Sequence, residues 1–165
     1  MSKKYILIGI DPGSIRLGYA LLIVFNGLVS LEKSGVIVFK KKDTLSQKLL
    51  YVFDFFKEII ANYISCGFLV CFSIEKQYLN KNPRSSFVLV SFNSVILLLA
   101  ESFQTKCFEI APTQIKKIIS GNGACGKLDI CFVLERQFGI SLDVVSLDES
   151  DAIAIAIAGA FLLGA

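Results

Sequence analysis

The sequence predicts a single α/β domain, residues 1–165, with a mixed five-stranded sheet, and three observations lead to this fold class. Two continuous apolar runs, Tyr5–Ile10 and Phe68–Ile74, have the length and composition of buried strands. Asn26-Gly27 separates two further apolar segments and is typical of a tight β-hairpin, because both residues tolerate the positive φ of a type I′ turn. After this hairpin, segments of helical length alternate with short strands, as in α/β proteins.

Turn and capping signals mark where the expected elements begin and end. The first strand ends at the turn-forming Asp11-Pro12-Gly13, and Thr44 and Gln47 have the spacing of a capping box that opens a helix. In chain order we expect strands at Tyr5–Ile10, Tyr19–Phe25 and Leu28–Phe39, a helix from Thr44 to about Ile64, a strand at Phe68–Ile74, a helix at Ser86–Ser102, a strand at Lys106–Ile110, and helices at Pro112–Ser120, Ala124–Gln137 and Glu149–Leu163.

The apolar composition, 54% of residues, raises the question of a membrane protein. The longest runs without charge, Ile59–Ile74 and Ser85–Ala100, contain sixteen residues each, and the second carries five Ser and Asn side chains. A spanning helix needs about 20 predominantly apolar residues, so we expect both runs to be core segments. The apolar run after Lys3-Lys4 is too short for a signal peptide, and we therefore predict neither membrane insertion nor export.

The chain contains no histidine, which excludes Ser/His/Asp and Cys/His catalysis and every His-ligated metal site. Five cysteines are present without a C-x-x-C pair, and we expect them to be reduced packing residues: Cys66, Cys71, Cys107, Cys125 and Cys131.

Carboxylates end two of the expected buried strands, at Asp11 and Glu75, and open α/β folds bind ligands at the carboxyl ends of their strands. Asp148 and Asp151 lie three residues apart, on one side of the first turn of the last expected helix. Four converging carboxylates need a compensating cation. All-oxygen ligand sets suit Mg²⁺, for which Mn²⁺ can substitute, and two such ions stabilise the attacking and leaving oxygens of phosphodiester hydrolysis.

Structural roles are the alternative for three of these acids. Asp148 or Asp151 could cap the helix and interact with its dipole, and Asp11 could begin an ordinary Asp-Pro-Gly turn. Glu75 directly follows an apolar run, so its charge needs a partner or an exit to water. Together the four acids favour a site.

Two lysines flank a glycine-containing break, Gly121-Asn122-Gly123, that lets backbone approach a phosphate. Lys116 precedes the break and Lys127 follows it, and the alternative is that both are solvated charges on helix faces. Without the four acids the chain has 17 basic and 10 acidic residues, which suits a polyanionic partner.

Five short motifs extend over almost the whole chain: Ile10-Asp11-Pro12-Gly13-Ser14 with Gly18-Tyr19, Ile74-Glu75-Lys76-Gln77-Tyr78, Ala111-Pro112 with Ile115-Lys116, Gly121-x-Gly123-Ala124 before Lys127, and Asp148-x-x-Asp151-Ala152-Ile153-Ala154. In this order the sequence resembles the RuvC-type Holliday junction resolvases of the RNase H-like superfamily. In its short, histidine-free form it is most similar to the poxviral branch.

The resemblance implies an RNase H-like fold and catalytic metal ligation by Asp11, Glu75, Asp148 and Asp151, with Lys116 and Lys127 near the scissile phosphate. It also places Tyr78 where bacterial members carry an aromatic side chain that stacks on bases at the crossover; a partly buried loop tyrosine is the alternative. Glu149 could compete with Asp148 as a ligand. We expect further DNA contacts from basic side chains near these motifs: Lys76, Lys81, Arg84 and Lys117.

We therefore predict a homodimeric, metal-dependent endodeoxyribonuclease that resolves four-way DNA junctions by paired symmetric nicks. Two identical sites match the two-fold symmetry of the junction, and part of Ser86–Ser102 is the expected dimer surface. The poxviral resemblance implies that the enzyme separates concatemeric viral DNA in the host cell cytoplasm. One alternative is a fragment of an actin- or hexokinase-like ATPase, because Asp11-x-Gly13 with Gly18 resembles the phosphate loop of those proteins. The other alternative is a non-catalytic DNA-binding module of the same fold.

Overall fold

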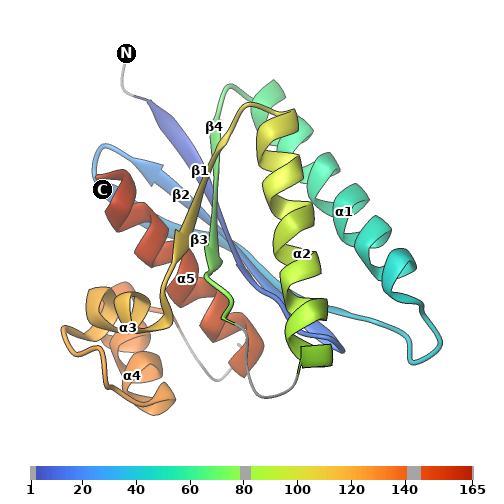
Figure 1. Ribbon diagram of the computed structural model, residues 1–165. Helices are drawn as coiled ribbons and strands as arrows, with labels where there is room; N and C mark the ends of the chain where they lie inside the picture. Colours follow the sequence, from blue (N-terminus) through green and yellow to red (C-terminus); the bar gives the residue numbers. More distant parts are fainter. Residues whose placement is uncertain (1–2, 79–82, 141–145, 165) are drawn as a thin grey trace.

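The computed structural model describes residues 3–78, 83–140 and 146–164, and a five-stranded sheet of order β3-β2-β1-β4-β5 lies at its centre (Figure 1). The first three strands, β1 (Lys4–Asp11), β2 (Arg16–Phe25) and β3 (Leu28–Val38), form an antiparallel meander. β4 (Leu69–Glu75) pairs parallel to β1, and β5 (Lys106–Ile110) pairs parallel to β4. The expected mixed sheet of an α/β fold is confirmed.

Helices cover both faces of this sheet (Figure 1). α1 (Leu45–Ser65) and α2 (Pro83–Ser102) lie on one face, over the buried side chains of Ile6, Ile8 and Ile10 from β1. α5 (Leu147–Leu163) lies on the other face, and α3 (Pro112–Ser120) and α4 (Lys127–Phe138) pack against it. Alternate residues of each buried strand therefore enter two separate cores.

Local hydrogen bonds explain where helices begin. Thr44 caps α1, and its capping box with Gln47 is confirmed. Ser146 caps α5 in a second capping box with Glu149, so α5 begins at Leu147, two residues earlier than expected. α2 also begins earlier, at Pro83.

Two other elements, α4 and β2, begin three residues away from their expected first residue. α4 begins at Lys127 instead of Ala124, because the Asn122 side chain accepts a hydrogen bond from the Ala124 backbone and holds that segment in a turn. β2 begins at Arg16, since its ladder with β3 extends to the pair Arg16 and Val38.

All five cysteines are free, as expected, but they do not all serve as packing residues. Cys71 and Cys125 are buried, whereas Cys66, the C-cap of α1, is exposed.

α2 has one buried and one exposed apolar side. Phe92, Ile96 and Leu99 are buried in the core between the helices and the sheet, while Phe87 and Leu98 are exposed. By length and composition the segment Ser85–Ser102 could cross a membrane, although a third of that window, 33%, is buried inside the fold. The helix therefore contributes to the core and also leaves an unpartnered apolar surface.

α5 approaches the sheet so closely that only glycine fits at the contacts. A Cβ on Gly9 of β1 would lie 2.3 Å from the backbone oxygen of Ala152, and a Cβ on Gly18 of β2 would lie 2.1 Å from that of Asp148. On the helix side, a Cβ on Gly159 would lie 2.6 Å from the Cβ of Ser73. Because these contacts fix α5 against the sheet, they also fix where its first turn stands relative to the strand ends.

We expect Gly9→Ala to lower the free energy of unfolding by about 3 kcal/mol, because the added methyl group overlaps helix backbone and α5 must move outward. Urea denaturation of the purified protein measures this. Gly126→Ala is the control: its Cβ would meet only the Asp129 side chain at 3.5 Å, and the loss should stay below about 1 kcal/mol. Equal losses in the two variants would show that the close approach has no special energetic role.

Candidate active site

The site begins with two carboxylates at the ends of neighbouring parallel strands. β1 and β4 pair in register up to Ile10 and Ile74, and Asp11 and Glu75 are the next residues along each strand. Both side chains line the same cavity. The two apolar runs predicted to be buried strands therefore lie side by side and bring these acids together.

Helices on the α5 face complete this cavity, which has a volume of about 250 Å³. α5 contributes Asp151, α3 contributes Lys116 and α4 contributes Lys127. The remaining wall is largely apolar: Pro112, Ile115, Ile130, Ala154 and Ile155. Three of the four predicted acids and both predicted lysines therefore converge in one place, although the Lys127 side chain remains 64% exposed to water.

The carboxylates repel one another in a partly dry environment. Burial raises the pKa of Asp11 to about 7, and the charges of Asp151, Glu75 and Asp148 contribute to this rise while Lys127 opposes it. Burial and the Asp151 charge likewise raise the pKa of Glu75, against the lowering effects of Lys127 and Lys116. Such a pair favours any cation that enters the cavity.

Lys127 is the cation closest to this cluster. It forms a salt bridge with Asp151, and this hydrogen bond raises the pKa of the ammonium group despite partial burial. Lys127 is the first residue of α4, so the turn that delays the start of that helix also sets the position of this contact.

Asp148 does not line the cavity. Its carboxylate forms a salt bridge with the Arg16 guanidinium, with 2.7 Å between Oδ2 and Nε, and 51% of the Arg16 and 39% of the Asp148 side chain are exposed. Since Ser146 caps α5, neither Asp148 nor Asp151 is its capping residue. Arg16 was not among the predicted site residues, because nothing in the sequence pairs it with an acid so far along the chain.

Glu149 is held elsewhere. Partial burial raises the pKa of its carboxyl group, but hydrogen bonds from the Ser146 backbone and side chain and from Ser34 outweigh burial and lower it. The side chain thus serves the capping box and ties α5 to β3 instead of competing with Asp148.

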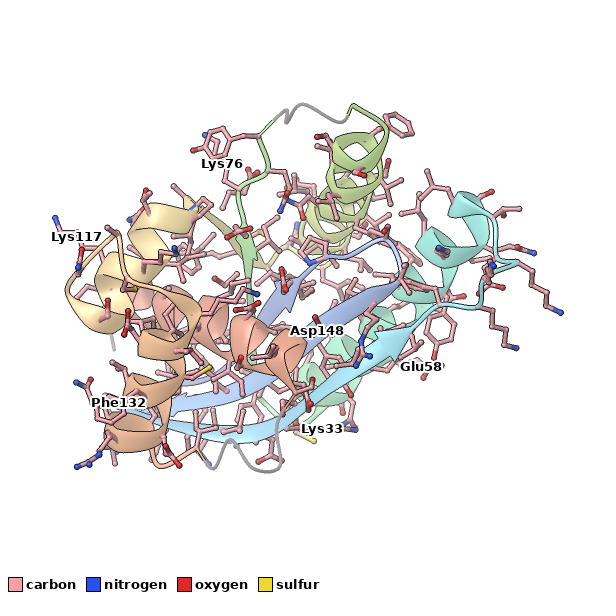
Figure 2. All side chains as sticks on the ribbon, turned by 90° about the horizontal axis from the view of Figure 1, so that it is seen from below. Lys33, Glu58, Lys76, Lys117, Phe132 and Asp148 are labelled. Carbon is pink, nitrogen blue, oxygen red and sulfur yellow. The ribbon has the colours of Figure 1, made fainter. Side chains whose placement is uncertain are left out.

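The other predicted DNA-contacting residues are distributed around the site. Lys76 and Tyr78 follow β4 and are exposed, Tyr78 by 54%, so this tyrosine is not the partly buried loop residue of the alternative interpretation. Figure 2 shows Lys117 pointing outward from α3, far from Asp148. Lys81 and the side chain of Arg84 lie outside the described residues.

Two side-chain amides donate hydrogen bonds to the backbone oxygen of Glu75, and sequence reasoning did not identify them. Asn93 of α2, only 6% exposed, donates a hydrogen bond from Nδ2 to the Glu75 backbone oxygen at 2.9 Å, and Gln77 donates to the same oxygen at 3.3 Å. Within the described residues the Oδ1 atom of Asn93 has no hydrogen-bond partner. The sequence signal for Asn93 was weak, because it is one of five Ser and Asn side chains in the run Ser85–Ala100.

This sheet order, with acids at the ends of β1 and β4 and on α5, defines a protein of the RNase H-like class. Comparison with known proteins is more specific. A model described as crossover junction endodeoxyribonuclease RuvC matches residues 7–159. The relative from Anaplasma phagocytophilum (strain HZ) is 35% identical over 96% of this chain and 96% of its own, and that from Ehrlichia canis (strain Jake) is 33% identical over 94% and 96%. The chain belongs to the RuvC family of crossover junction endodeoxyribonucleases.

Solved structures agree with this fold. Thermus thermophilus RuvC in complex with a Holliday junction substrate superimposes with a TM-score of 0.82 at 19% identity, covering 96% of this chain and 94% of that one. The fowlpox virus resolvase in complex with junction DNA gives 0.52 at 16% identity over 96% and 98%. The RuvC-type resemblance is confirmed, whereas the similarity to the poxviral branch is not, because the relatives in sequence are bacterial. The family match also favours the enzyme over the ATPase fragment and the non-catalytic module.

The high pKa of Asp11 predicts a pH-dependent effect of Asp11→Asn on the metal-free protein. Above its ordinary pKa of 3.8 this carboxyl group is ionised in the unfolded chain, so folding must either protonate it or bury its charge. The resulting cost in folding free energy is small near pH 4 and is complete above about pH 7. Asp11→Asn should therefore stabilise the protein at pH 8 by up to about 4 kcal/mol, at roughly 1.4 kcal/mol per pKa unit, with little gain at pH 4. Urea denaturation in EDTA at both pH values measures this; equal effects at the two would contradict the assignment.

Proposed function

We propose that this chain resolves four-way DNA junctions by metal-dependent paired nicks, with Asp11, Glu75, Asp148 and Asp151 as metal ligands. The observation that carries the proposal is the convergence of Asp11, Glu75 and Asp151 with two lysines in one cavity. Membership of a family named for junction cleavage, and the junction bound to Thermus thermophilus RuvC, support branched DNA as the substrate.

The donor set fits a hard divalent cation. Its oxygens are all carboxylate oxygens, and the pKa values of Asp11 and Glu75 are raised by burial and by the charges of neighbouring acids, which a bound cation would offset. Within the described residues no three His, Cys, Asp or Glu side chains are already arranged to hold an ion. Asp151 and Asp148 are instead bonded to Lys127 and Arg16, which neutralise them. Ligation therefore exchanges these two ion pairs for bonds to the cation.

Mg²⁺, with Mn²⁺ as a substitute and two ions per site, would supply charge stabilisation to the attacking and leaving oxygens of the phosphodiester. The protein's own groups have separate tasks. Glu75 and Asp11 stand on rigid strand ends, and the bonds to the Glu75 backbone oxygen fix the end of β4. Released from Asp151, Lys127 can contact a phosphate together with Lys116, and the exposed Tyr78 can stack on an unpaired base.

Two copies of the chain would cut the two symmetric strands of a junction, and the exposed apolar side of α2 is our candidate for their contact surface. Its large apolar side chains repeat at helical spacing: Phe87, Val90, Leu97 and Leu98. Contiguous apolar surface of this kind is costly to leave in water. The buried side of the same helix supports Glu75 through Asn93, so the dimer contact would stand directly behind the site.

The biological setting is proposed only at the level of junction resolution. Separation of concatemeric viral DNA in the host cell cytoplasm stays a prediction from the resemblance of the sequence motifs to poxviral resolvases, and the likeness to the fowlpox enzyme, at 16% identity, supports the fold alone.

We expect Asp11→Asn, Glu75→Gln and Asp151→Asn each to reduce junction cleavage by about 1000-fold or more, corresponding to about 4 kcal/mol of lost transition-state stabilisation. Junction binding should be retained or tightened, because each change removes a negative charge without removing bulk. Gel assays of cleavage with Mg²⁺, and of binding in EDTA, measure the two effects. Asp54→Asn, an exposed acid on α1, is the matched control and should cut at the wild-type rate. Full-rate cleavage by the three site variants would refute the ligand assignment.

We expect Leu98→Glu to convert a dimer into a monomer, because the change places a charge on the exposed apolar side of α2. Sedimentation velocity at micromolar concentration measures the oligomeric state. Leu28→Glu is the control, since Leu28 is even more exposed but is the first residue of β3, away from α2, and should leave the dimer intact. A wild-type protein that is monomeric at these concentrations would remove the dimer from the proposal.

A further inference from the structure

A run of three lysines joins β3 to α1, and none of the three lines the catalytic cavity. Lys40, Lys41 and Lys42 are all exposed. With Lys48, the segment from residue 39 to residue 51 contains four lysines and one acid, Asp43, an excess of +3 that equals the net charge of the whole chain. Positive charge is therefore concentrated in this segment.

The lysine run stands on a fixed turn. The Asp43 carboxylate accepts a hydrogen bond from the Lys40 backbone at 2.8 Å, and the Asp43 backbone donates to the Lys40 carbonyl at 3.0 Å. The one acid of the segment is thus used to close the turn. Because the hydrogen bonds of the turn already fix the backbone of the lysine run, binding a ligand costs less conformational entropy than it would for a flexible segment.

This turn is attached to the loop that follows Asp11. The Phe39 backbone donates to the Ile15 carbonyl at 2.9 Å, and Lys48 donates to the Ser14 carbonyl at 2.7 Å with its ammonium group 5.3 Å from the centre of the Phe39 ring. Strand register places Arg16 opposite Val38, two residues before Lys40. Basic side chains therefore continue from the Arg16–Asp148 pair beside the site to the lysine run.

A groove of about 460 Å³ lies next to this turn, between the end of β3 and the first turns of α1. Its lining is mixed, with Lys40, Lys48, Gln47 and the exposed Tyr51 among the side chains that face it. Hydrogen-bond donors and positive charge beside a shallow groove suit a sugar–phosphate backbone. The groove lacks the enclosed, apolar character of a site for a small organic molecule.

We infer that Lys40, Lys41 and Lys42 form a second DNA-contacting surface that holds the phosphate backbone of one duplex arm of the substrate, apart from the catalytic cavity. The inference rests on the proposed function for the identity of the substrate. Each phosphate contact releases condensed counterions, so the surface contributes affinity that does not depend on sequence and decreases as salt increases. In a dimer the two copies of the surface would hold two arms related by the symmetry axis.

The test compares three variants by measuring junction affinity in EDTA as a function of salt concentration. The triple change Lys40→Gln, Lys41→Gln and Lys42→Gln should weaken binding at least tenfold at 0.1 M salt. It should also make the slope of log affinity against log salt shallower by about 0.9 for each phosphate that is no longer neutralised, and thus by up to about 2.7. The corresponding triple change to arginine keeps the charge and should retain both the affinity and the slope.

Three other lysines provide a charge-matched control. Lys3, Lys4 and Lys106 are exposed. Lys4 and Lys106 are the first residues of β1 and β5, and these strands end on the side of the site, so the three lysines lie at the other end of the strands. Their triple change to glutamine removes the same charge and should leave the slope within about 0.5 of wild type. The inference would be overturned if the slope for the Lys40, Lys41 and Lys42 glutamine variant equalled that of the wild type, or if the control variant changed the slope by the same amount. Cleavage by the wild-type protein and its loss in Asp11→Asn test the proposed function separately, so the two can fail independently.

Discussion

The close packing of α5 on the sheet is the contact on which the rest of this structure depends. Gly9 and Gly18 leave room for helix backbone to rest directly on the strands, and Gly159 does the same from the helix side. The alternating Ala and Ile residues of α5 are almost all buried, so the helix has very little freedom to shift. As a result, the first turn of α5 stands above the ends of β1 and β4, and Asp151 faces the cavity that Asp11 and Glu75 line.

This placement works against the stability of the fold. Three carboxylates in one cavity repel each other, and burial raises the pKa values of two of them. The chain reduces the cost with its own cations: Lys127 pairs with Asp151 inside the cavity, and Arg16 pairs with Asp148 outside it. Both cations are partly exposed and can exchange partners at little cost, since ion pairs in contact with water contribute about 0–1 kcal/mol. The protein can therefore fold without an ion and still give up its internal ion pairs.

Sequence reasoning predicted the parts of this site that follow from periodicity. Apolar runs that end on Asp11 and Glu75 indicated buried strands, and parallel pairing then required the two acids to be neighbours. Contacts chosen among side-chain rotamers could not be predicted in this way. The pairing of Asp148 with Arg16 depends on the closeness of β2 to the first turn of α5, and Lys116 and Lys117, adjacent in sequence, differ only in helix phase. Helix starts were missed where a polar side chain, such as Asn122, bonds to backbone outside the helix.

The order of elements along the chain also determines when the site can exist during synthesis. β1, which carries Asp11, is synthesised before the other described elements, whereas α5 (Leu147–Leu163) is synthesised after them. The nascent chain can pair its first strands soon after they emerge, but the groove on the α5 face stays open, and Asp151 is missing, until the last helix is released. A partly synthesised or C-terminally truncated product would thus have the beginning of the fold without its set of acids. A nuclease built in this order therefore cannot assemble its set of acids before α5 has been synthesised.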